Sequence, residues 1–278
     1  MNLQNDVKEL FAYWIEERLC VLERKSRDDE KPWSDDPVFQ TTYFCNVDRE
    51  QDRVTKWIRE RYSPHVDCHH FTANIVLSRF VNKPETLANL PYWHEYFEDQ
   101  PDNIWCEVMS KPGAWGSAYI VSTNGRRQPK HEYIAGLLER LFTQLYGPPG
   151  TVLGGTLATA HRRLQAVQGL GSFMAAQVVA DLKNTKGHPL ADAEDWYAFA
   201  APGPGSLRGL SRFHQRQVTA TKFEGALASA RQWLYNNGYK LLVQDLCNQN
   251  LQNCFCEFDK YVRVKNGEGR SKRKYNGV

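Results

Sequence analysis

Apolar residues return every three or four positions along most of the chain, and this period predicts a mainly α protein. The expected helices cover residues 6–25, 71–81, 84–97, 134–145 and 215–238. Residues 112–123 break the period, so they are expected to form a loop or an extended segment.

Two short helices joined by a tight turn are predicted over residues 164–183. The glycines on either side of Leu170 allow positive φ and a close approach of the backbone to a neighbour. The amides that open the second helix lie at the positive end of its dipole and can bind phosphate. The pattern therefore predicts a helix-hairpin-helix element that contacts the DNA backbone through Gly169, Leu170, Gly171 and Ser172. An ordinary helical corner with a glycine C-cap is the alternative, and the spacing alone does not separate the two.

No linker or internal repeat divides the chain, so residues 1–278 are expected to form a single helical domain with a basic arm over residues 263–278. The net charge is only +3, which makes local clusters of charge more informative than the total. Seven scattered cysteines favour reduced thiols. Neither Cys-His-His at 68–70 nor the cysteines near 250 have metal-ligand or iron–sulfur spacing, and no apolar run has transmembrane length.

Two basic segments are candidate contacts to a nucleic-acid backbone. The turn over residues 124–130 supplies Arg126, Arg127 and Lys130, and the C-terminal arm supplies Arg270 and Lys272. The alternatives are a solvated surface turn and a disordered terminus.

Two further segments could bind phosphate or pyrophosphate. Polar residues over 44–58 repeat at three and four positions, which predicts one helix face lining a cleft; a solvated face of ion pairs is the alternative. Glycine and proline over 201–210 predict a rigid turn with exposed amides. The candidate residues are Asn46, Arg49, Arg53, Gly203, Gly205, Ser206 and Arg208.

Two carboxylates follow the hairpin, because Asp192 and Asp195 lie 21 and 24 positions after Gly171. In helix-hairpin-helix DNA glycosylases a catalytic aspartate follows the hairpin at about this separation. The lysine nucleophile of the bifunctional members is replaced here by Phe173, which disfavours Schiff-base chemistry. A carboxylate at a cleft mouth could stabilise a cation or accept a proton. The alternative for Asp195 is a helix N-cap.

Taken together, five segments of the chain resemble the alpha-glutamyl/putrescinyl thymine pyrophosphorylase group, whose helical domain is also fused to 5-hydroxymethyluracil DNA kinases. The segments are residues 31–37, 44–53, 169–183, 203–210 and 256–261, and the resemblance extends over about residues 8–275. It implies a DNA-glycosylase-like helical fold and a place in the phage pathways that hypermodify thymine. No Gly-x-x-x-x-Gly-Lys-Ser/Thr phosphate loop occurs in the sequence, which favours the transferase of these pathways over the kinase.

The resemblance therefore implies an enzyme, an amino acid (or amine):DNA transferase that flips a pyrophosphorylated 5-hydroxymethyluracil out of DNA and replaces its pyrophosphate. Asp195 and Asp192 would be catalytic, and Lys260 would join the pyrophosphate-binding residues. The co-substrate is an amine, with no metal or other cofactor expected. The expected partners are double-stranded DNA with modified thymine and a hydroxymethyluracil DNA kinase, in the bacterial host cytoplasm if the chain is phage-encoded, without a membrane. The alternatives are a DNA glycosylase and a non-catalytic DNA-binding partner of the kinase.

Overall fold

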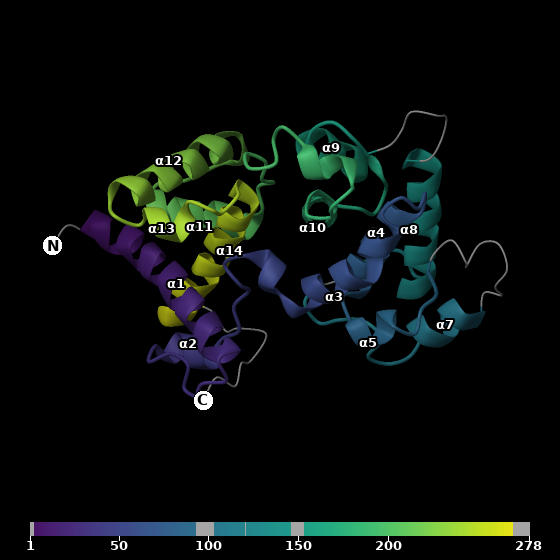
Figure 1. The fold of residues 1–278 in the computed structure, drawn as a ribbon, viewed down its shortest axis with the longest axis horizontal. Helices are drawn as coiled ribbons and strands as arrows, with labels where there is room; N and C mark the ends of the chain where they lie inside the picture. Colours follow the sequence, from purple (N-terminus) through teal and green to yellow (C-terminus); the bar gives the residue numbers. More distant parts are fainter. Residues whose placement is uncertain (1–2, 93–102, 120, 146–152, 269–278) are drawn as a thin grey trace. The chain divides into compact units, whose positions relative to one another are not determined.

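The computed structural model describes residues 3–92, 103–119, 121–145 and 153–268, and all elements in these ranges are helices (Figure 1). The predicted mainly α class is therefore confirmed. The chain divides into two compact units, one formed by Met1–Asp52 and Tyr197–Val278, the other by Arg53–Trp196. The single-domain organisation stays a prediction.

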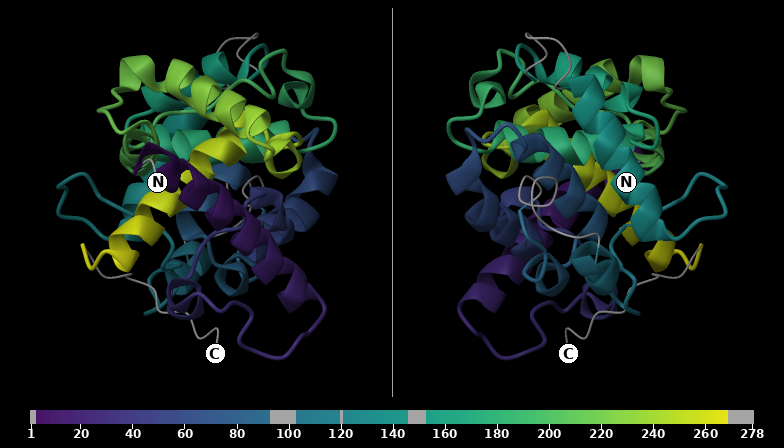
Figure 2. Two further views of the ribbon diagram at one scale, coloured as in Figure 1. Left: turned by 90° about the vertical axis from the view of Figure 1, so that its left-hand side faces the viewer. Right: turned by 90° about the vertical axis from the view of Figure 1, so that its right-hand side faces the viewer.

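The first unit joins the two ends of the chain around an aromatic core. Its helices are α1 (Leu3–Ser26), α2 (Pro37–Thr41), the 3-10 helix η1 (Arg49–Gln51), α11 (Pro204–His214), η4 (Ala220–Lys222), α12 (Phe223–Asn236), α13 (Lys240–Val243) and α14 (Asn248–Lys265). Helices α1 and α14 cross one another (Figure 2). Phe11 of α1 stacks on Phe255 of α14 with 4.0 Å between ring centroids, and Phe213 of α11 meets both rings edge-on. The apolar stripe predicted for residues 6–25 thus faces this core.

Helices α11 and α14 lie in close contact because α11 carries glycine where they meet. A Cβ atom on Gly209 would overlap the backbone carbonyl of Phe255, and one on Gly205 would overlap the thiol of Cys256. Glycine inside a helix costs about 0.5–1 kcal/mol relative to alanine. The close approach of the two helices explains why glycine stands here.

Residues 204–210 of the segment predicted as a rigid, amide-exposing turn over 201–210 form the start of α11, so that prediction was wrong. Pro204 occupies the first turn, where a missing N–H breaks no helical bond. The Ser206 hydroxyl accepts a bond from the Gly203 amide at 3.1 Å, and Gly205 and Ser206 are buried.

Other predicted boundaries also shift. Residues 215–238 do not form one helix, because Gln215 ends α11 in a left-handed conformation (φ 50°) and α12 begins only at Phe223. Within 84–97 the helix is Pro84–Leu87, and residues 93–102 lie outside the described ranges.

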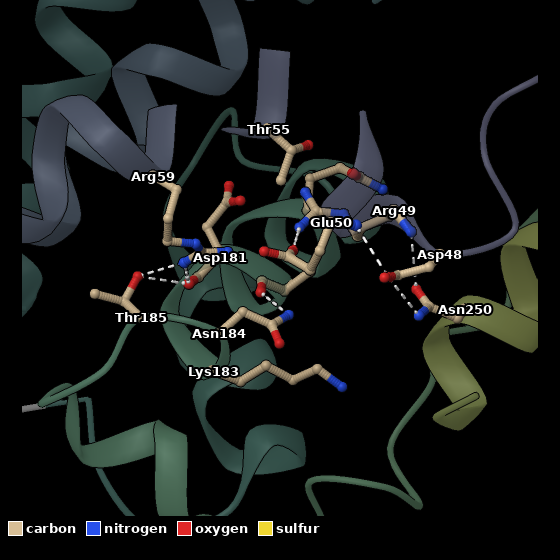
Figure 3. Close-up of polar contacts among 12 residues, drawn as sticks. Asp48, Arg49, Glu50, Thr55, Arg59, Asp181, Lys183, Asn184, Thr185 and Asn250 are labelled. Carbon is tan, nitrogen blue, oxygen red and sulfur yellow. Dashed lines mark hydrogen bonds and ion pairs between the residues drawn. The ribbon is translucent and has the colours of Figure 1, made fainter. Parts of the chain in front are cut away.

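The second unit surrounds helix α4, all of whose residues are buried. Its helices are α3 (Arg53–Tyr62), η2 (Ser63–His65), α4 (Phe71–Val81), α5 (Pro84–Leu87), α7 (Asn103–Met109), α8 (Lys130–Leu145), α9 (Leu157–Ala166), α10 (Ser172–Lys183) and η3 (Pro189–Asp192). Arg79 of α4 forms a buried, bidentate ion pair with Asp181 of α10. Arg59 of α3 donates to the Asp181 carbonyl and to Thr185 (Figure 3). These contacts fix α10 against α3 and α4.

Replacing Gly209 with alanine is expected to lower the free energy of unfolding by about 2–3 kcal/mol, because the new methyl group meets backbone that cannot turn away. Gly225→Ala is the matched control. It lies on α12 with no described atom within 4 Å of the added Cβ, so it should raise stability by up to about 1 kcal/mol. Urea denaturation followed by circular dichroism measures both, and equal effects would contradict the packing role of Gly209.

Candidate functional site

The two helices and the turn predicted over 164–183 are present as α9, a turn at 167–171 and α10, here called the hairpin, while its role as a helix-hairpin-helix DNA-binding element stays a prediction. Gly169 has φ +102°, and a Cβ atom there would overlap the hydroxyl of Tyr133, so the fold requires glycine. Leu170 is buried and fixes the turn in the core. Gly171 differs, since its φ of −70° suits any residue and an added Cβ would meet no described atom within 4 Å. Nothing in the described part of the fold accounts for glycine at 171.

The start of α10 is open and lies beside positive charge. Gly171 is the N-cap and has no side chain to bind the first amides of the helix. Nearby, the guanidinium groups of Arg126 and Arg140 donate to the side-chain and backbone oxygens of Gln168, both at 3.4 Å. The helix dipole and these two arginines make the turn a suitable place for an anion.

The other predicted DNA contacts are less defined. Ser172 is half-buried, and its carbonyl contacts the His161 ring at 2.9 Å. Arg127 and Lys130 are exposed, Lys130 as the first residue of α8. Arg270 and Lys272 lie outside the described residues.

The carboxylate of Asp195 binds the first turn of α9. Its two oxygens accept from the amides of Leu157 at 2.7 Å and Ala158 at 3.0 Å, from a position 38 residues beyond Leu157. Asp195 is therefore not the N-cap residue that the sequence left open as an alternative, because the N-cap of α9 is Thr156, and Asp195 binds the start of that helix from a distant part of the chain. A carboxylate has about four lone-pair sites, so two bonds leave each oxygen able to accept another proton donor. Asp192 is exposed at the end of η3.

The single helix predicted over 44–58 does not form. The Asp48 carboxylate caps η1 at the Glu50 amide (3.0 Å) and accepts from Asn250 of α14 at 3.1 Å (Figure 3). Asp52 ends η1 in an extended conformation. Because these side chains replace helical bonds with local ones, the predicted shared face was wrong.

The three polar residues of that face are therefore separated. The Asn46 side chain donates to Asp52 at 2.8 Å and accepts from Arg18. Arg49 is buried in η1 and forms an ion pair with Glu50 at 3.3 Å. Arg53 belongs to the second unit, where it opens α3 exposed and lies 3.7 Å from Glu85.

A buried carboxylate on α14 gathers three guanidinium groups in the first unit. The side chain of Asp259 is 1% exposed and accepts from Arg208 Nε at 2.8 Å and from Arg212 Nε at 3.0 Å, both on α11. Arg263, one turn along α14, lies 3.3 Å away. Arg212 also donates to Glu268 at 2.6 Å. Three guanidinium groups face two carboxylates, so the group, here called the Asp259 cluster, keeps a net positive charge.

Sequence reasoning named Arg208 but missed the other members of the Asp259 cluster. The available signal was the spacing of four between Arg208 and Arg212, and again between Asp259 and Arg263, which puts each pair on one helix face. Lys260, also named, contacts different groups. Its ammonium pairs with Glu257 at 2.5 Å and lies 5.0 Å from the centre of the Phe44 ring.

Burial favours the protonated form of two thiols on α14, those of Cys254 and Cys256. Burial raises the pKa of Cys256 to about 11, and it raises that of Cys254 further still. Among the described residues no three His, Cys, Asp or Glu side chains are grouped as metal ligands. No helix in these ranges is long and apolar enough to cross a membrane.

Comparison with known proteins identifies the family. The family model described as "5-hmdU DNA kinase, helical domain" matches residues 5–271. The chain belongs to this family. The matched range contains the α9–α10 hairpin, Asp195 and the Asp259 cluster of this chain. The resemblance to hydroxymethyluracil DNA kinases is thereby confirmed.

A similar protein is the 5-hmdU DNA kinase of Bacillus phage SP10, which is 24% identical over 226 residues. The match covers 72% of this chain and 35% of the phage kinase, so the chain spans about a third of that relative's length. No solved structure matches the chain. The transferase assignment within the 5-hmdU DNA kinase helical-domain family stays a prediction.

Removing the Asp195 carboxylate should loosen α9 in this member of the family. Asp195→Ala is expected to cost about 1–2 kcal/mol, the usual loss for a missing N-terminal cap, which corresponds to about 5- to 30-fold faster hydrogen exchange at the α9 amides. Asp192→Ala, at the exposed end of η3, is the matched control and should change stability by less than about 0.5 kcal/mol. Unchanged exchange in α9 after loss of Asp195 would contradict the capping role.

Proposed function

We propose that this member of the 5-hmdU DNA kinase helical-domain family is an amine:DNA transferase that acts on pyrophosphorylated 5-hydroxymethyluracil in DNA. The amine nitrogen of an amino acid or polyamine forms a bond to the exocyclic carbon of the base. The bond from that carbon to the pyrophosphate oxygen breaks, and the amine gives up a proton. Pyrophosphate leaves, and no cofactor takes part. The relative in phage SP10 is a 5-hmdU DNA kinase, which supports a place in the same pathway.

The Asp259 cluster is the observation that carries this proposal. Residues 203–210 and 256–261, two of the segments in which the resemblance is found, lie on α11 and α14, and the contact of these helices joins Arg208 to Asp259. Asp259 is the only bonding partner of Arg208 among the described residues, and it binds Nε. The Nη groups of this 52% exposed side chain therefore remain as donors for an anion. Neutralising the charge on pyrophosphate makes it a better leaving group.

The hairpin supports the DNA-binding part of the proposal. The open amides of α10 and the unexplained glycine at 171 suit a phosphate of the DNA backbone, while the modified base leaves the stack to react. We propose a DNA-glycosylase-like arrangement for these helices. In this scheme Asp195 uses its remaining lone pairs to orient or deprotonate the amine, with Asp192 as the second carboxylate.

The remaining site residues are assigned by the same proposal. Lys260 would assist in binding the substrate. Double-stranded DNA with modified thymine is the substrate, a hydroxymethyluracil DNA kinase supplies it, and the place of action is the bacterial host cytoplasm if the chain is phage-encoded.

A second candidate function, DNA binding without catalysis, is favoured by the contacts of Asp195. Both of its oxygens already bind α9, which is a complete structural reason for a carboxylate at that position. On this account the chain would present modified DNA to the kinase. Asp195→Asn separates the two functions, since the amide keeps an oxygen for capping and loses the negative charge. Turnover should be abolished if Asp195 acts on the amine, with DNA binding retained.

The transferase is tested by incubating the protein with pyrophosphorylated hydroxymethyluracil DNA and a mixture of amino acids and polyamines. Nucleosides from the digested DNA are then weighed by mass spectrometry, and released pyrophosphate is measured. We expect a nucleoside with an amine adduct. Arg208→Gln should lower the rate about a hundredfold, because a donor to the departing charge is lost.

Arg216→Gln is the matched control for Arg208. Arg216 is exposed just after α11 and outside the Asp259 cluster, so its loss should leave the rate within about twofold. An abasic product would identify a glycosylase. Unchanged nucleosides together with tight DNA binding would favour the binding module.

The phosphate contact at the hairpin is tested by Gly171→Asp. An aspartate N-cap should raise the stability by a few tenths of a kcal/mol, while its charge repels a phosphate and weakens DNA binding about tenfold. Gly225→Asp adds the same charge at an exposed position of α12 and should leave DNA affinity unchanged. Fluorescence anisotropy at fixed salt measures both, and unaltered binding by the Gly171 variant would exclude a phosphate at this turn.

A further inference from the structure

An aromatic side chain stands exposed at the first turn of α10. Phe173 is 56% exposed, and its ring meets the ring of Tyr119 edge-on, with 5.3 Å between centroids and 72° between planes. The Tyr119 hydroxyl donates to Gln177 at 3.3 Å, one turn further along α10. Tyr119 thus braces one edge of Phe173, while more than half of the phenylalanine faces outward.

The surroundings of Phe173 favour a partner that has both negative charge and aromatic rings. Single exposed apolar residues are common on protein surfaces, so exposure alone identifies no partner. Here the ring lies two residues from Gly171, at the uncapped start of α10, and Arg126 and Arg140 flank the same turn through Gln168. Positive charge that follows a phosphate backbone, together with aromatic rings on which bases stack, is the combination found in proteins that bind unpaired nucleic acid.

We infer that Phe173, braced by Tyr119, stacks on a nucleobase that is unpaired in the bound DNA. The phosphate of that strand lies at the amides of α10, and the ring of Phe173 covers a base face that pairing and stacking in the duplex would otherwise hide. The protein therefore prefers DNA containing an unpaired base over fully paired DNA. This inference rests on the proposed function only in that the hairpin contacts DNA.

The test compares two labelled duplexes of one sequence, one fully paired and one with a single bulged thymine, in fluorescence anisotropy titrations with the full chain. Wild-type protein should bind the bulged duplex about tenfold more tightly than the paired one. Phe173→Ala should lose about tenfold in affinity for the bulged duplex and less than about twofold for the paired duplex. Phe173→Trp, which keeps a stacking surface, should retain the preference.

Leu241→Ala is the matched control, because Leu241 is 79% exposed in the first unit and should affect neither duplex. Thermal melting should be unchanged for all variants, since these side chains are exposed. Equal loss on both duplexes, or equal affinity of the wild type for both, would overturn the stacking inference while leaving the backbone contact intact. No binding of either duplex by the wild type would overturn the DNA-binding part of the proposed function as well.

Discussion

The close contact between helices α11 and α14 depends on glycine in α11. The same contact brings together the Asp259 cluster and the aromatic core of the first unit. Gly205 and Gly209 let the backbone of α14 lie against α11. The same approach brings Asp259 within hydrogen-bond distance of two arginines on α11. A buried carboxylate without such partners would be strongly destabilising. The glycines therefore allow the close approach of the helices, and the arginines compensate the carboxylate that this approach buries.

In the second unit a buried ion pair joins two helices, as the Asp259 cluster does in the first unit. Arg79 and Asp181 are both almost inaccessible to solvent, and two guanidinium nitrogens of Arg79 donate to the two carboxylate oxygens of Asp181 in a forked geometry. A buried pair of this kind gives little net stability, because desolvation opposes the attraction. What it supplies is orientation, since it holds α10 at one rotation on α4. The start of α10, and with it the hairpin, is positioned by that rotation.

The sequence predicted those features that depend on local pattern. The helix over 71–81 was predicted with its observed bounds, and two helices joined by a turn over 164–183 were predicted from two glycines and the apolar residues around them. The helix over 44–58 failed because Asp48 and Asp52 bind backbone amides within a few residues, and such local bonds compete with the helix. The spacing of polar and apolar residues does not show whether side-chain bonds or helical bonds will form.

Features that depend on distant residues were not predictable in the same way. The glycines in 201–210 are compatible both with a turn and with a close contact between helices. Only the position of the Phe255 backbone against Gly209 decides between the two. Asp259 lies 51 residues from Arg208 along the chain, so neither residue alone indicates the cluster. The bond from the Leu157 amide to Asp195 spans 38 residues, and the sequence offered only an N-cap role for Asp195, not this distant contact.

The glycines of the chain supply an internal comparison that separates packing from function. At Gly169 and Gly209 an added Cβ would overlap a described neighbour, so the fold itself explains the residue. At Gly171 it would meet none, and serine, aspartate or asparagine would cap α10 better. Two residues later Phe173 leaves apolar surface in water at the same helix end. Two features within residues 171–173 thus lower stability: a glycine N-cap and an exposed aromatic ring. Features that lower stability without a structural reason are expected where a protein binds its ligand.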